Sequence, residues 1–448
     1  MTEVAEHEPQ VREELERLVE LALDEARSRG VDQAEVAVSQ DRGLSTTARL
    51  GDVESLEFTN DRGIGITVYK DSCKGNASTS DVSPAAIREA VAKACSFARL
   101  TASDPHSGLA DTELMCTDIR DLDLDHPWSL DADQAIALAI ECEAAALGYD
   151  KRIGNSEGAT VSTNRGSRAY GNTHGFIGSY SCTSHSITCV VLAESDGTMQ
   201  RDYQYTASRD PEGLDDALSV GETAARKTLG RLGAIKIKTV DAPVLFVPEL
   251  ARGFIGHAIG AIAGGSQYRR SSFLLEAAGE KIFSDFVQIQ ERPHLAKGMS
   301  SASYDAEGVT TYDRDIVTDG VLQGYVLSSY SARRLGLETT ANAGGAQNLI
   351  VQGGGKDLAQ LLSDMGTGFL VEELIGQGVN AVTGDYSRGA VGHWVKHGEI
   401  QHAVHEVTIA GNLRDLYLRI AAIGNDQDLR GGIRCGSLLV EEMTIAGA

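Results

Sequence analysis

The most unusual group of polar residues lies near the end of the chain, in the segment Thr383-Gly384-Asp385-Tyr386-Ser387-Arg388-Gly389. Asp385 and Arg388 stand three residues apart and could form an ion pair, while the residues between them, Tyr386 and Ser387, offer hydroxyls. The flanking glycines permit tight turns, and the planar fork of an arginine can hold a carboxylate or backbone carbonyls. The segment therefore predicts either a contact for a substrate or partner, or a turn that satisfies its own polar groups and shapes the wall of a groove.

Four histidines lie in the next segment and suggest a metal site, namely His393, His397, His402 and His405. A hairpin that turns at His397-Gly398 would place successive side chains on alternating faces. His393 and His397 would then share a face, while His402 and His405 would point apart. Because a zinc site needs three or four ligands around one point, we favour surface histidines or histidines with hydrogen-bond partners.

Two glycine-rich motifs resemble a nucleophile elbow and a phosphate-binding loop, but the residues around them do not fit either motif. Gly154–Gly158 matches Gly-x-Ser-x-Gly, but a nucleophile elbow needs a helix after the serine, and residues 159–163 have the pattern of a strand. Gly353-Gly354-Gly355-Lys356 lacks the first glycine of a phosphate-binding loop and has Asp357 where that motif needs Ser or Thr. Both motifs are therefore interpreted as turns.

A buried helix must position the chemistry of the second half of the chain. It is predicted from Gly253 onward, because apolar residues recur there at helical spacing: Phe254, Ile255, Ala258, Ile259 and Ile262. Gly256, Gly260 and Gly264 would form a bare stripe along it. An interior glycine costs a helix about 1 kcal/mol relative to alanine, so we expect the stripe to allow a close crossing by another helix or backbone. The pair Gly264-Gly265 is expected to end the helix.

Two units of similar pattern are predicted ahead of this helix, each with antiparallel strands between two helices. We place them at residues 1–115 and 125–235, joined by a polar linker. Turns are expected inside the strand regions, at Asp41-Arg42-Gly43, Gly51-Asp52, Asn60-Asp61-Arg62-Gly63 and Thr163-Asn164-Arg165-Gly166. Residues 240–448, with many short strands, are predicted to form a β-rich C-terminal domain. The predicted fold class is therefore α+β, with N-terminal helix and antiparallel-sheet units followed by a β-rich domain.

The composition limits the partners and the compartment. With 40 Lys and Arg against 64 Asp and Glu, the 448 residues carry a formal charge of −24, which argues against nucleic acid and anionic membranes as partners. Seven scattered cysteines without a Cys-x-x-Cys pair fit reduced thiols in a cytosol. The polar start, Met1–Glu6, does not have the pattern of a signal peptide, and no apolar run approaches the ~20 residues that span a bilayer. We therefore expect a cytoplasmic protein with no membrane partner.

Six ordered segments of the chain resemble the TldD/PmbA metallopeptidase family, once described as modulators of DNA gyrase, and they point to its PmbA (TldE) branch. The resemblance covers essentially the whole chain and is densest from Pro243 to the end. The segments are Tyr268-Arg269-Arg270-Ser271-Ser272-Phe273-Leu274, Tyr304-Asp305-Ala306-Glu307-Gly308, Ser329-Tyr330-Ser331-Ala332-Arg333, Ala341-Asn342-Ala343-Gly344-Gly345, Thr383-Gly384-Asp385-Tyr386-Ser387-Arg388-Gly389-Ala390 and Ala410-Gly411-Asn412-Leu413.

The zinc motif of the family is where this chain departs from it. The TldD branch carries His-Glu-x-x-x-His on the predicted helix, and the resemblance implies that this motif holds a catalytic zinc. Here the three positions hold Gly256, His257 and Ala261, and neither glycine nor alanine can bind a metal. The cysteine ligand that TldD supplies falls near Ile423-Gly424, and Cys435 comes too late in the sequence. The resemblance therefore implies that this chain binds no cofactor and that zinc lies on a TldD-like partner, which leaves His257 as a core or interface histidine.

The resemblance implies a subunit of a metallopeptidase complex that degrades or processes small or unfolded peptides inside a cavity shared by two chains. It leaves open a heterodimer with a TldD-like zinc subunit or a homodimer. The residues expected to line the peptide or partner groove are His257, Tyr268, Arg269, Asp385, Tyr386, Ser387 and Arg388. Two alternatives remain, an independent homodimeric peptidase or hydrolase and an acidic regulatory protein that binds a basic partner.

Overall fold

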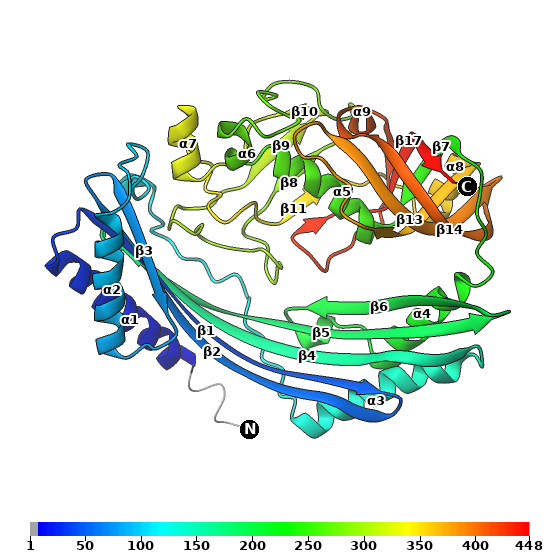
Figure 1. The fold of residues 1–448 in the computed structure, drawn as a ribbon, viewed down its shortest axis with the longest axis horizontal. Helices are drawn as coiled ribbons and strands as arrows, with labels where there is room; N and C mark the ends of the chain where they lie inside the picture. The colour runs from blue at the N-terminus through cyan, green and yellow to red at the C-terminus, as the bar shows by residue number, and fades with distance from the viewer. Residues whose placement is uncertain (1–7, 448) are drawn as a thin grey trace.

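The computed structural model describes residues 8–447, and its fold is α+β, with helices and an antiparallel sheet first and a β-rich domain after them (Figure 1). The predicted fold class is therefore confirmed. The start of the chain, Met1–Glu6, on which we based the absence of a signal peptide, lies outside the described residues. Within residues 8–447, no helix has the length and the apolar composition that a membrane crossing requires.

A single six-stranded antiparallel sheet spans the first half of the chain, in the order β3-β2-β1-β4-β5-β6. The strands of residues 1–115 and those of 125–235 join in it through β1 and β4, which pair from Glu35↔Asn172 to Ala48↔Ala159. The strands are β1 (Gln33–Arg49), β2 (Asp52–Lys70), β3 (Cys73–Thr79), β4 (Ile153–Asn172), β5 (Ile177–Ser195) and β6 (Thr198–Ser208).

Of the turns predicted inside the strand regions, the one at Gly51-Asp52 is confirmed, and the other three are wrong. Residues 41–43 continue β1 and pair with 59–61 of β2 on one side and with 164–166 of β4 on the other. The polar side chains suggested turns, but the backbone groups of all three segments bond to neighbouring strands, and the side chains stay on alternating faces. The chain does turn between β1 and β2, where Leu50 and Gly51 have φ of 52° and 83° and donate their N–H groups to the buried Glu143 carboxylate.

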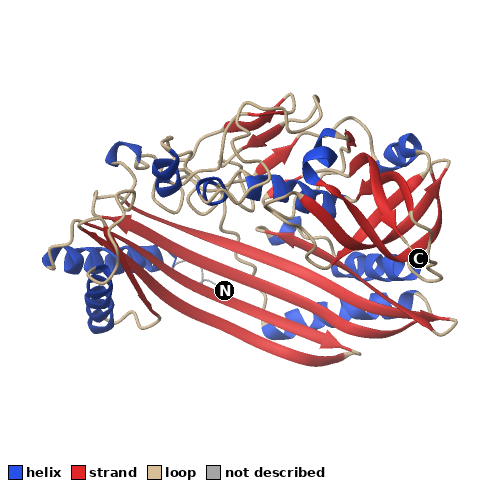
Figure 2. Ribbon diagram, turned by 45° about the horizontal axis from the view of Figure 1, so that its top comes forward, coloured by secondary structure: helices blue, strands red, loops and turns tan. Residues whose placement is uncertain are grey.

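Four helices cover one face of this sheet, in two pairs at its two ends (Figures 1 and 2). They are α1 (Glu8–Ser28) with α2 (Pro84–Ala98), and α3 (Ala132–Tyr149) with α4 (Ala217–Gly230). Apolar side chains of α1 and α2 pack on Val36, Val38 and Ile64 of the sheet. α3 and α4 approach closely because Gly221 lacks a Cβ, which would lie 2.1 Å from the Cys142 carbonyl oxygen.

The other face of the sheet is polar and lies toward the C-terminal domain (Figure 1). Small hydroxyl side chains meet across its strands, with Ser45 Oγ 2.8 Å from Ser162 Oγ and Thr47 Oγ1 2.9 Å from Thr160 Oγ1. Because apolar and small polar residues alternate along β1, one strand serves both the helix-covered core and the open polar face.

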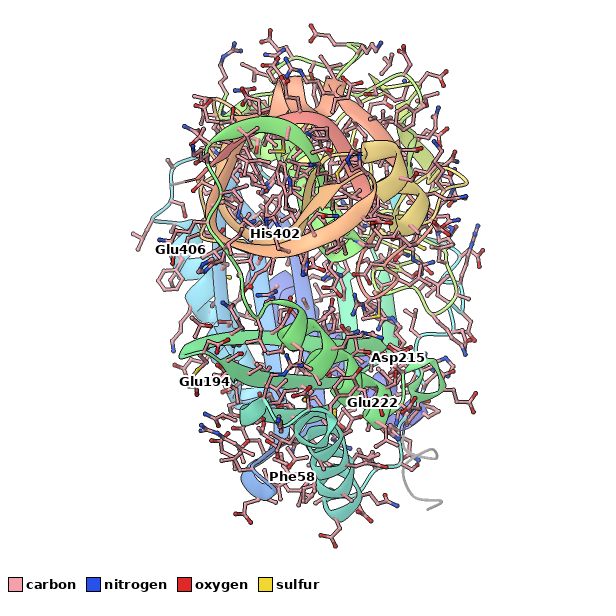
Figure 3. The ribbon with its side chains drawn as sticks, turned by 90° about the vertical axis from the view of Figure 1, so that its right-hand side faces the viewer. Phe58, Glu194, Asp215, Glu222, His402 and Glu406 are labelled. Carbon is pink, nitrogen blue, oxygen red and sulfur yellow. The ribbon has the colours of Figure 1, made fainter. Side chains whose placement is uncertain are left out.

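The C-terminal domain contains a second six-stranded sheet in the order β14-β13-β12-β7-β17-β15, and a further pairing of β14 with β17 curls it back on itself (Figure 3). A five-stranded sheet, β10-β9-β8-β11-β16, lies beside it. The strands are β7 (Val240–Phe246), β8 (Ile289–Glu291), β9 (Arg314–Thr318), β10 (Val321–Leu322), β11 (Leu349–Val351), β12 (Gly368–Ile375), β13 (Asp385–Lys396), β14 (Glu399–Asn412), β15 (Ile420–Ile423), β16 (Ile433–Arg434) and β17 (Leu438–Ala446). The helices are α5 (Pro248–Ala261), α6 (Gly264–Tyr268), α7 (Ser329–Leu335), α8 (Leu358–Met365) and α9 (Leu413–Leu418).

Candidate functional site

The predicted helix is α5. It follows directly after β7 and packs in the core of the C-terminal domain. Pro248 stands at its first position, where a missing N–H has no cost. Its buried face packs in the main core through Phe254, whose ring stacks on Phe246 with centroids 5.1 Å apart. The helix ends at Ala261, before Gly264-Gly265, and these two glycines instead begin the short helix α6. The predicted helix is therefore present but ends a few residues earlier than expected.

The glycine stripe of α5 does not form the close crossing that we expected. A Cβ added at Gly260 would meet no atom within 4 Å, and one at Gly256 would meet only Ile433 Cδ1, at 3.6 Å. Gly264, beyond the helix, does make a close approach, since its Cβ would lie 2.3 Å from Ser331 Oγ of α7. On α5 itself the bare backbone faces a groove of about 390 Å³, here named the glycine groove, lined by Arg252, Gly253, Gly256, Ile259, Ala346, Leu349, Gly431, Gly432 and Ile433.

The residues at the family's zinc positions do not fit a zinc ion. Gly256 and Ala261 have no donor atom, and Ile423 is buried in the core. Cys435 is buried too, and burial, reinforced by the Asp426 carboxylate, raises the pKa of its thiol to about 12, so the thiolate that zinc prefers is disfavoured. Across residues 8–447, no three His, Cys, Asp or Glu side chains gather as a metal site would require. That this chain carries no zinc stays a prediction.

His257 instead contacts the polar segment of β13. Its imidazole lies edge-on to the Tyr386 ring, with centroids 6.1 Å apart. Burial, and then the positive charge of Arg388, lower the pKa of His257, so the neutral ring is favoured at neutral pH. The structure thus brings His257, Tyr386 and Arg388 together, from two segments that are far apart in the sequence.

Asp385 and Ser387 lie on the opposite face of β13, and the ion pair expected between Asp385 and Arg388 does not form. Asp385 instead accepts hydrogen bonds from Thr383 Oγ1 at 2.6 Å and from Asn412 Nδ2 at 3.2 Å. The physical reason is the period of two along a strand, which sends residues three apart to different faces. The sequence spacing predicted a turn, and the backbone is a strand from Asp385 onward.

Tyr386 and Arg388 keep polar atoms without partners. Tyr386 is 1% exposed, and neither its hydroxyl nor the buried Nε of Arg388 has a hydrogen-bond partner among the described residues. Burial raises the pKa of Tyr386 to about 12, although the Arg388 guanidinium, which lies beside the hydroxyl without good hydrogen-bond geometry, opposes the shift. Arg388 makes one long contact, from Nη2 to the Leu374 carbonyl oxygen at 3.5 Å. Such unmet donors in a native fold suggest a bound group or a partner contact.

Tyr268 and Arg269 belong to a different cluster, between α6 and α7. The Tyr268 ring stands edge-on to Tyr330, and the guanidinium carbons of Arg269 and Arg334 lie 5.1 and 5.3 Å from its centroid. Tyr330 in turn donates to Asp104 of the N-terminal half at 2.7 Å. The contacts of these two residues therefore tie the domains together and do not reach His257.

The four histidines of β13 and β14 do not share a site. The hairpin turns at His397-Gly398, as predicted, with φ of 54° and 76°. His393 bonds to Glu372 at 2.7 Å and to the Gly230 carbonyl at 3.0 Å. It therefore joins the C-terminal domain to the end of α4.

A large space lies between the polar face of the first sheet and the loops of the C-terminal domain. This sheet cleft, of about 1070 Å³, is bordered by strands β1, β2, β4 and β5 and by the loops 299–306 and 343–347. Its Ala346 also borders the glycine groove, so the two spaces adjoin. Our sequence reasoning missed this cleft, although the alternation of small polar and apolar residues along β1, as in Ser39, Ser45 and Thr47, was its signal.

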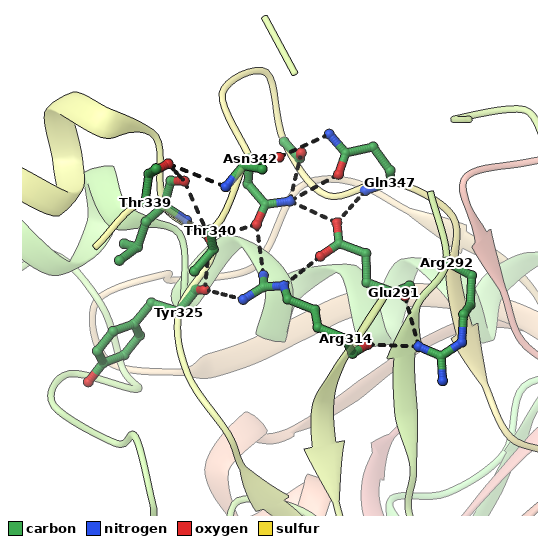
Figure 4. A network of polar contacts seen from close by, with 11 residues as sticks. Glu291, Arg292, Arg314, Tyr325, Thr339, Thr340, Asn342 and Gln347 are labelled. Carbon is green, nitrogen blue, oxygen red and sulfur yellow. Dashed lines mark hydrogen bonds and ion pairs between the residues drawn. The ribbon is translucent and has the colours of Figure 1, made fainter. Parts of the chain in front are cut away.

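A buried polar network fixes the loop on the far side of the cleft (Figure 4). Glu291 accepts hydrogen bonds from Arg314 Nε at 2.7 Å, from Asn342 Nδ2 at 2.7 Å and from the Gln347 N–H at 2.6 Å. Asp305 holds the same loop through the Ala343 N–H at 2.9 Å, and burial raises the pKa of this carboxyl to about 7. A loop fixed by these hydrogen bonds suits a binding surface, because little conformational entropy is lost in ordering it when a ligand binds.

Three family models match this chain, described as PmbA/TldA metallopeptidase domain 1 (residues 34–98), central domain (125–232) and C-terminal domain (239–447). The chain is 50% identical to Metalloprotease PmbA of Escherichia coli O157:H7, over 97% of both chains. It is 46% identical to the Metalloprotease PmbA homolog of Haemophilus influenzae, over 97% of this chain and 96% of that one.

Two solved structures agree in fold. A Bacteroides thetaiotaomicron protein, described as a candidate modulator of DNA gyrase, has a TM-score of 0.92 at 27% identity and covers 96% of this chain and 98% of its own. TldE from Thermococcus kodakarensis has a TM-score of 0.83 at 20% identity, over 96% of this chain and 99% of its own, which shows the shared fold. The chain belongs to the PmbA/TldD metallopeptidase family, in its PmbA (TldE) branch.

Proposed function

We propose that this protein is the zinc-free subunit of a TldD-type metallopeptidase and that it works in proteolysis together with a TldD-like zinc subunit. The observation that carries the proposal is local. Helix α5 packs in the core, and the positions at which the resemblance implies zinc-binding histidines hold Gly256 and Ala261. A family member without these donors needs another chain for the hydrolytic step, because an activated water requires the metal.

The sheet cleft and the adjoining glycine groove are the proposed peptide-binding surface. Hydroxyl side chains, glycines and backbone groups line much of both spaces, with charged side chains such as Arg168 and Arg252 among them. Hydrogen bonds to such a lining suit small or unfolded peptides of varied sequence. The group of His257, Tyr386 and Arg388 is proposed to contact the peptide or the partner, because two of its polar side chains have unmet donors. The formal charge of −24 and the seven cysteines, which form no disulfide, are consistent with the cytoplasm, and this location is part of the proposal.

Reconstitution tests the function. Purified chain, purified TldD-like subunit and their mixture are assayed with an unfolded peptide, and zinc is measured in each sample. We expect a complex of the two chains, cleavage that rises at least about tenfold on mixing, and zinc that follows the TldD-like chain. Chelator-sensitive cleavage by this chain alone would favour an independent homodimeric peptidase instead, and a complex without cleavage would favour a regulatory protein.

A further inference from the structure

A second cavity lies where the first sheet meets the C-terminal domain, and the function proposed above does not use it. This junction cavity, of about 710 Å³, is bordered by β6, α4, the start of α5 and the loops 296–299 and 426–430. Its volume is in the range of pockets that hold small ligands. Arg209 and Met299 border both this cavity and the sheet cleft, so a peptide in the cleft could extend into it.

Most charged side chains that line the junction cavity already have partners. Arg430 bonds to Glu249 at 2.6 Å and to Asp428 at 2.8 Å, and it lies 4.1 Å from the centre of the Tyr205 ring. Arg209 donates to three backbone carbonyl oxygens, those of Gly298, Thr183 and Met299. Ion pairs also hold Asp202, Lys227, Lys297 and Glu372.

Arg434 differs from these basic residues. It stands on β16 next to Ile433, which faces the glycine groove, while Arg434 lines the junction cavity. Its side chain has no ion pair or hydrogen bond among the described residues, and its Nε is buried without a partner. Burial alone lowers the pKa of Arg434, and no ion pair offsets that cost. A guanidinium left in this state favours an incoming anion, since a carboxylate can pair with its planar fork.

We infer that the junction cavity binds the C-terminal carboxylate of a short peptide through Arg434. The inference rests on the proposed peptide function and adds an anchor point to it. A peptide fits better than an inorganic dianion, because Asp215 and Asp426 line the same cavity and have no ion-pair partner within the described residues. Their negative charge opposes a phosphate but suits a ligand that carries positive charge at its other end.

Calorimetry on the full chain without partner or zinc tests the anchor. The probes are tetra-alanine as the free acid, tetra-alanine as the C-terminal amide, the amide of a tetrapeptide with an internal glutamate, and inorganic phosphate. The variants are Arg434→Gln and, as a control, Arg414→Gln, an exposed arginine of α9. We expect the free acid to bind wild type and the control at least about tenfold more tightly than either amide, and Arg434→Gln to abolish this difference.

Equal binding of the free acid and the C-terminal amide to wild type would overturn the inference. This comparison uses the wild-type protein only, so it does not depend on whether Arg434→Gln folds. An unchanged acid preference in a folded Arg434→Gln protein would also overturn it. Tighter binding of phosphate, or equal binding of the glutamate amide, would assign the site to other anions and remove the C-terminal anchor. The two proposals fail separately, because cleavage by the reconstituted mixture tests the function, whereas the acid preference is measured on this chain alone.

Discussion

The His257 imidazole and the Tyr386 ring meet edge to face, with centroids 6.1 Å apart and planes at 70°. The contact joins α5 to β13, the two segments whose residue patterns were most unusual in the sequence. Arg388 lies close enough that its charge lowers the pKa of His257 and opposes the rise of that of Tyr386. His257, which the resemblance places at the glutamate of the zinc motif, therefore packs against a tyrosine and lies near a cation.

The first prediction concerns zinc. Gly256 and Ala261 supply no ligand and His257 alone cannot close a metal shell, so the purified chain should hold far less than one zinc per molecule. Elemental analysis of protein made in zinc-replete medium measures this directly. The TldD-like chain, prepared in the same way, is the positive control, and about one tightly held zinc on this chain would contradict the prediction.

The second prediction compares two glycines of the same segment. Gly260→Ala should raise the free energy of unfolding by up to about 1 kcal/mol, because alanine favours the helix and its Cβ meets no atom. Gly264→Ala should lower it by about 1–3 kcal/mol, because its Cβ would lie 2.4 Å from Ser331 Cβ. Denaturant midpoints of both variants measure the difference, and a loss of stability in Gly260→Ala would show that an unseen contact covers the stripe.

The sequence predicted the elements whose evidence is local. The apolar spacing in Phe254, Ile255 and Ala258 was enough to identify α5, and the turn at His397-Gly398 was also correct. The prediction from sequence failed where a contact between distant segments determined the local structure. Residues 41–43 have turn-like side chains, but pairing with both β2 and β4 keeps them extended. Tertiary pairing of this kind overrides local preference.

The candidate site shows the same limit. Asp385 and Arg388 suggested an ion pair because their spacing suits a turn or helix, but a strand places them on opposite faces. The sheet cleft and the unpaired Arg434 depend on how the two halves of the chain meet. No pattern within either half contains that information.

The third prediction concerns pH. Burial opposes a charge on His393, but the hydrogen bond and the charge of Glu372 outweigh it and raise the pKa above the model-compound value of 6.5. The folded state therefore binds this proton more tightly than the unfolded state. The resulting stabilisation is complete below pH 6.5 and is lost as pH rises through the raised pKa.

Glu372→Gln should reduce this effect, because only the hydrogen bond to the Gly230 carbonyl would then oppose burial and the charge of Arg231 at His393. Unfolding midpoints at pH 5.5 and pH 8 should differ less in the variant than in wild type, and NMR titration of His393 should show a lower pKa. An unchanged pH dependence would mean that other groups dominate it. His402→Gln is a suitable control, because no hydrogen bond or ion pair to His402 occurs among the described side chains.

The fourth prediction separates Arg388 from Asp385. The two side chains share no partner, so the stability changes in Arg388→Ala and Asp385→Ala should add in the double variant to within about 0.5 kcal/mol. If Arg388 contacts the peptide or the partner, Arg388→Ala should also weaken cleavage by the reconstituted pair, while the isolated chain stays folded. Full activity in a stable Arg388→Ala complex would exclude this residue from the site.

The fifth prediction uses two buried tyrosines of the same core. Tyr417 donates its hydroxyl to the Phe254 carbonyl oxygen at 2.9 Å, whereas the Tyr386 hydroxyl lies beside the Arg388 guanidinium without a hydrogen bond of good geometry among the described residues. Tyr417→Phe should therefore lower the free energy of unfolding by about 1 kcal/mol or more. Tyr386→Phe should leave it unchanged or raise it, because the substitution removes a polar atom that burial penalises.

Cleavage by the reconstituted pair tests whether the Tyr386 hydroxyl has a role in the assembled enzyme. If the Tyr386 hydroxyl meets a peptide or partner group in the assembled enzyme, Tyr386→Phe should reduce cleavage or complex formation although the isolated chain is as stable as wild type. Tyr417→Phe should show the reverse, with lower stability and normal cleavage per folded complex. Lower stability and normal cleavage in Tyr386→Phe would instead mean that the hydroxyl has a partner inside the fold and contacts neither the peptide nor the other subunit.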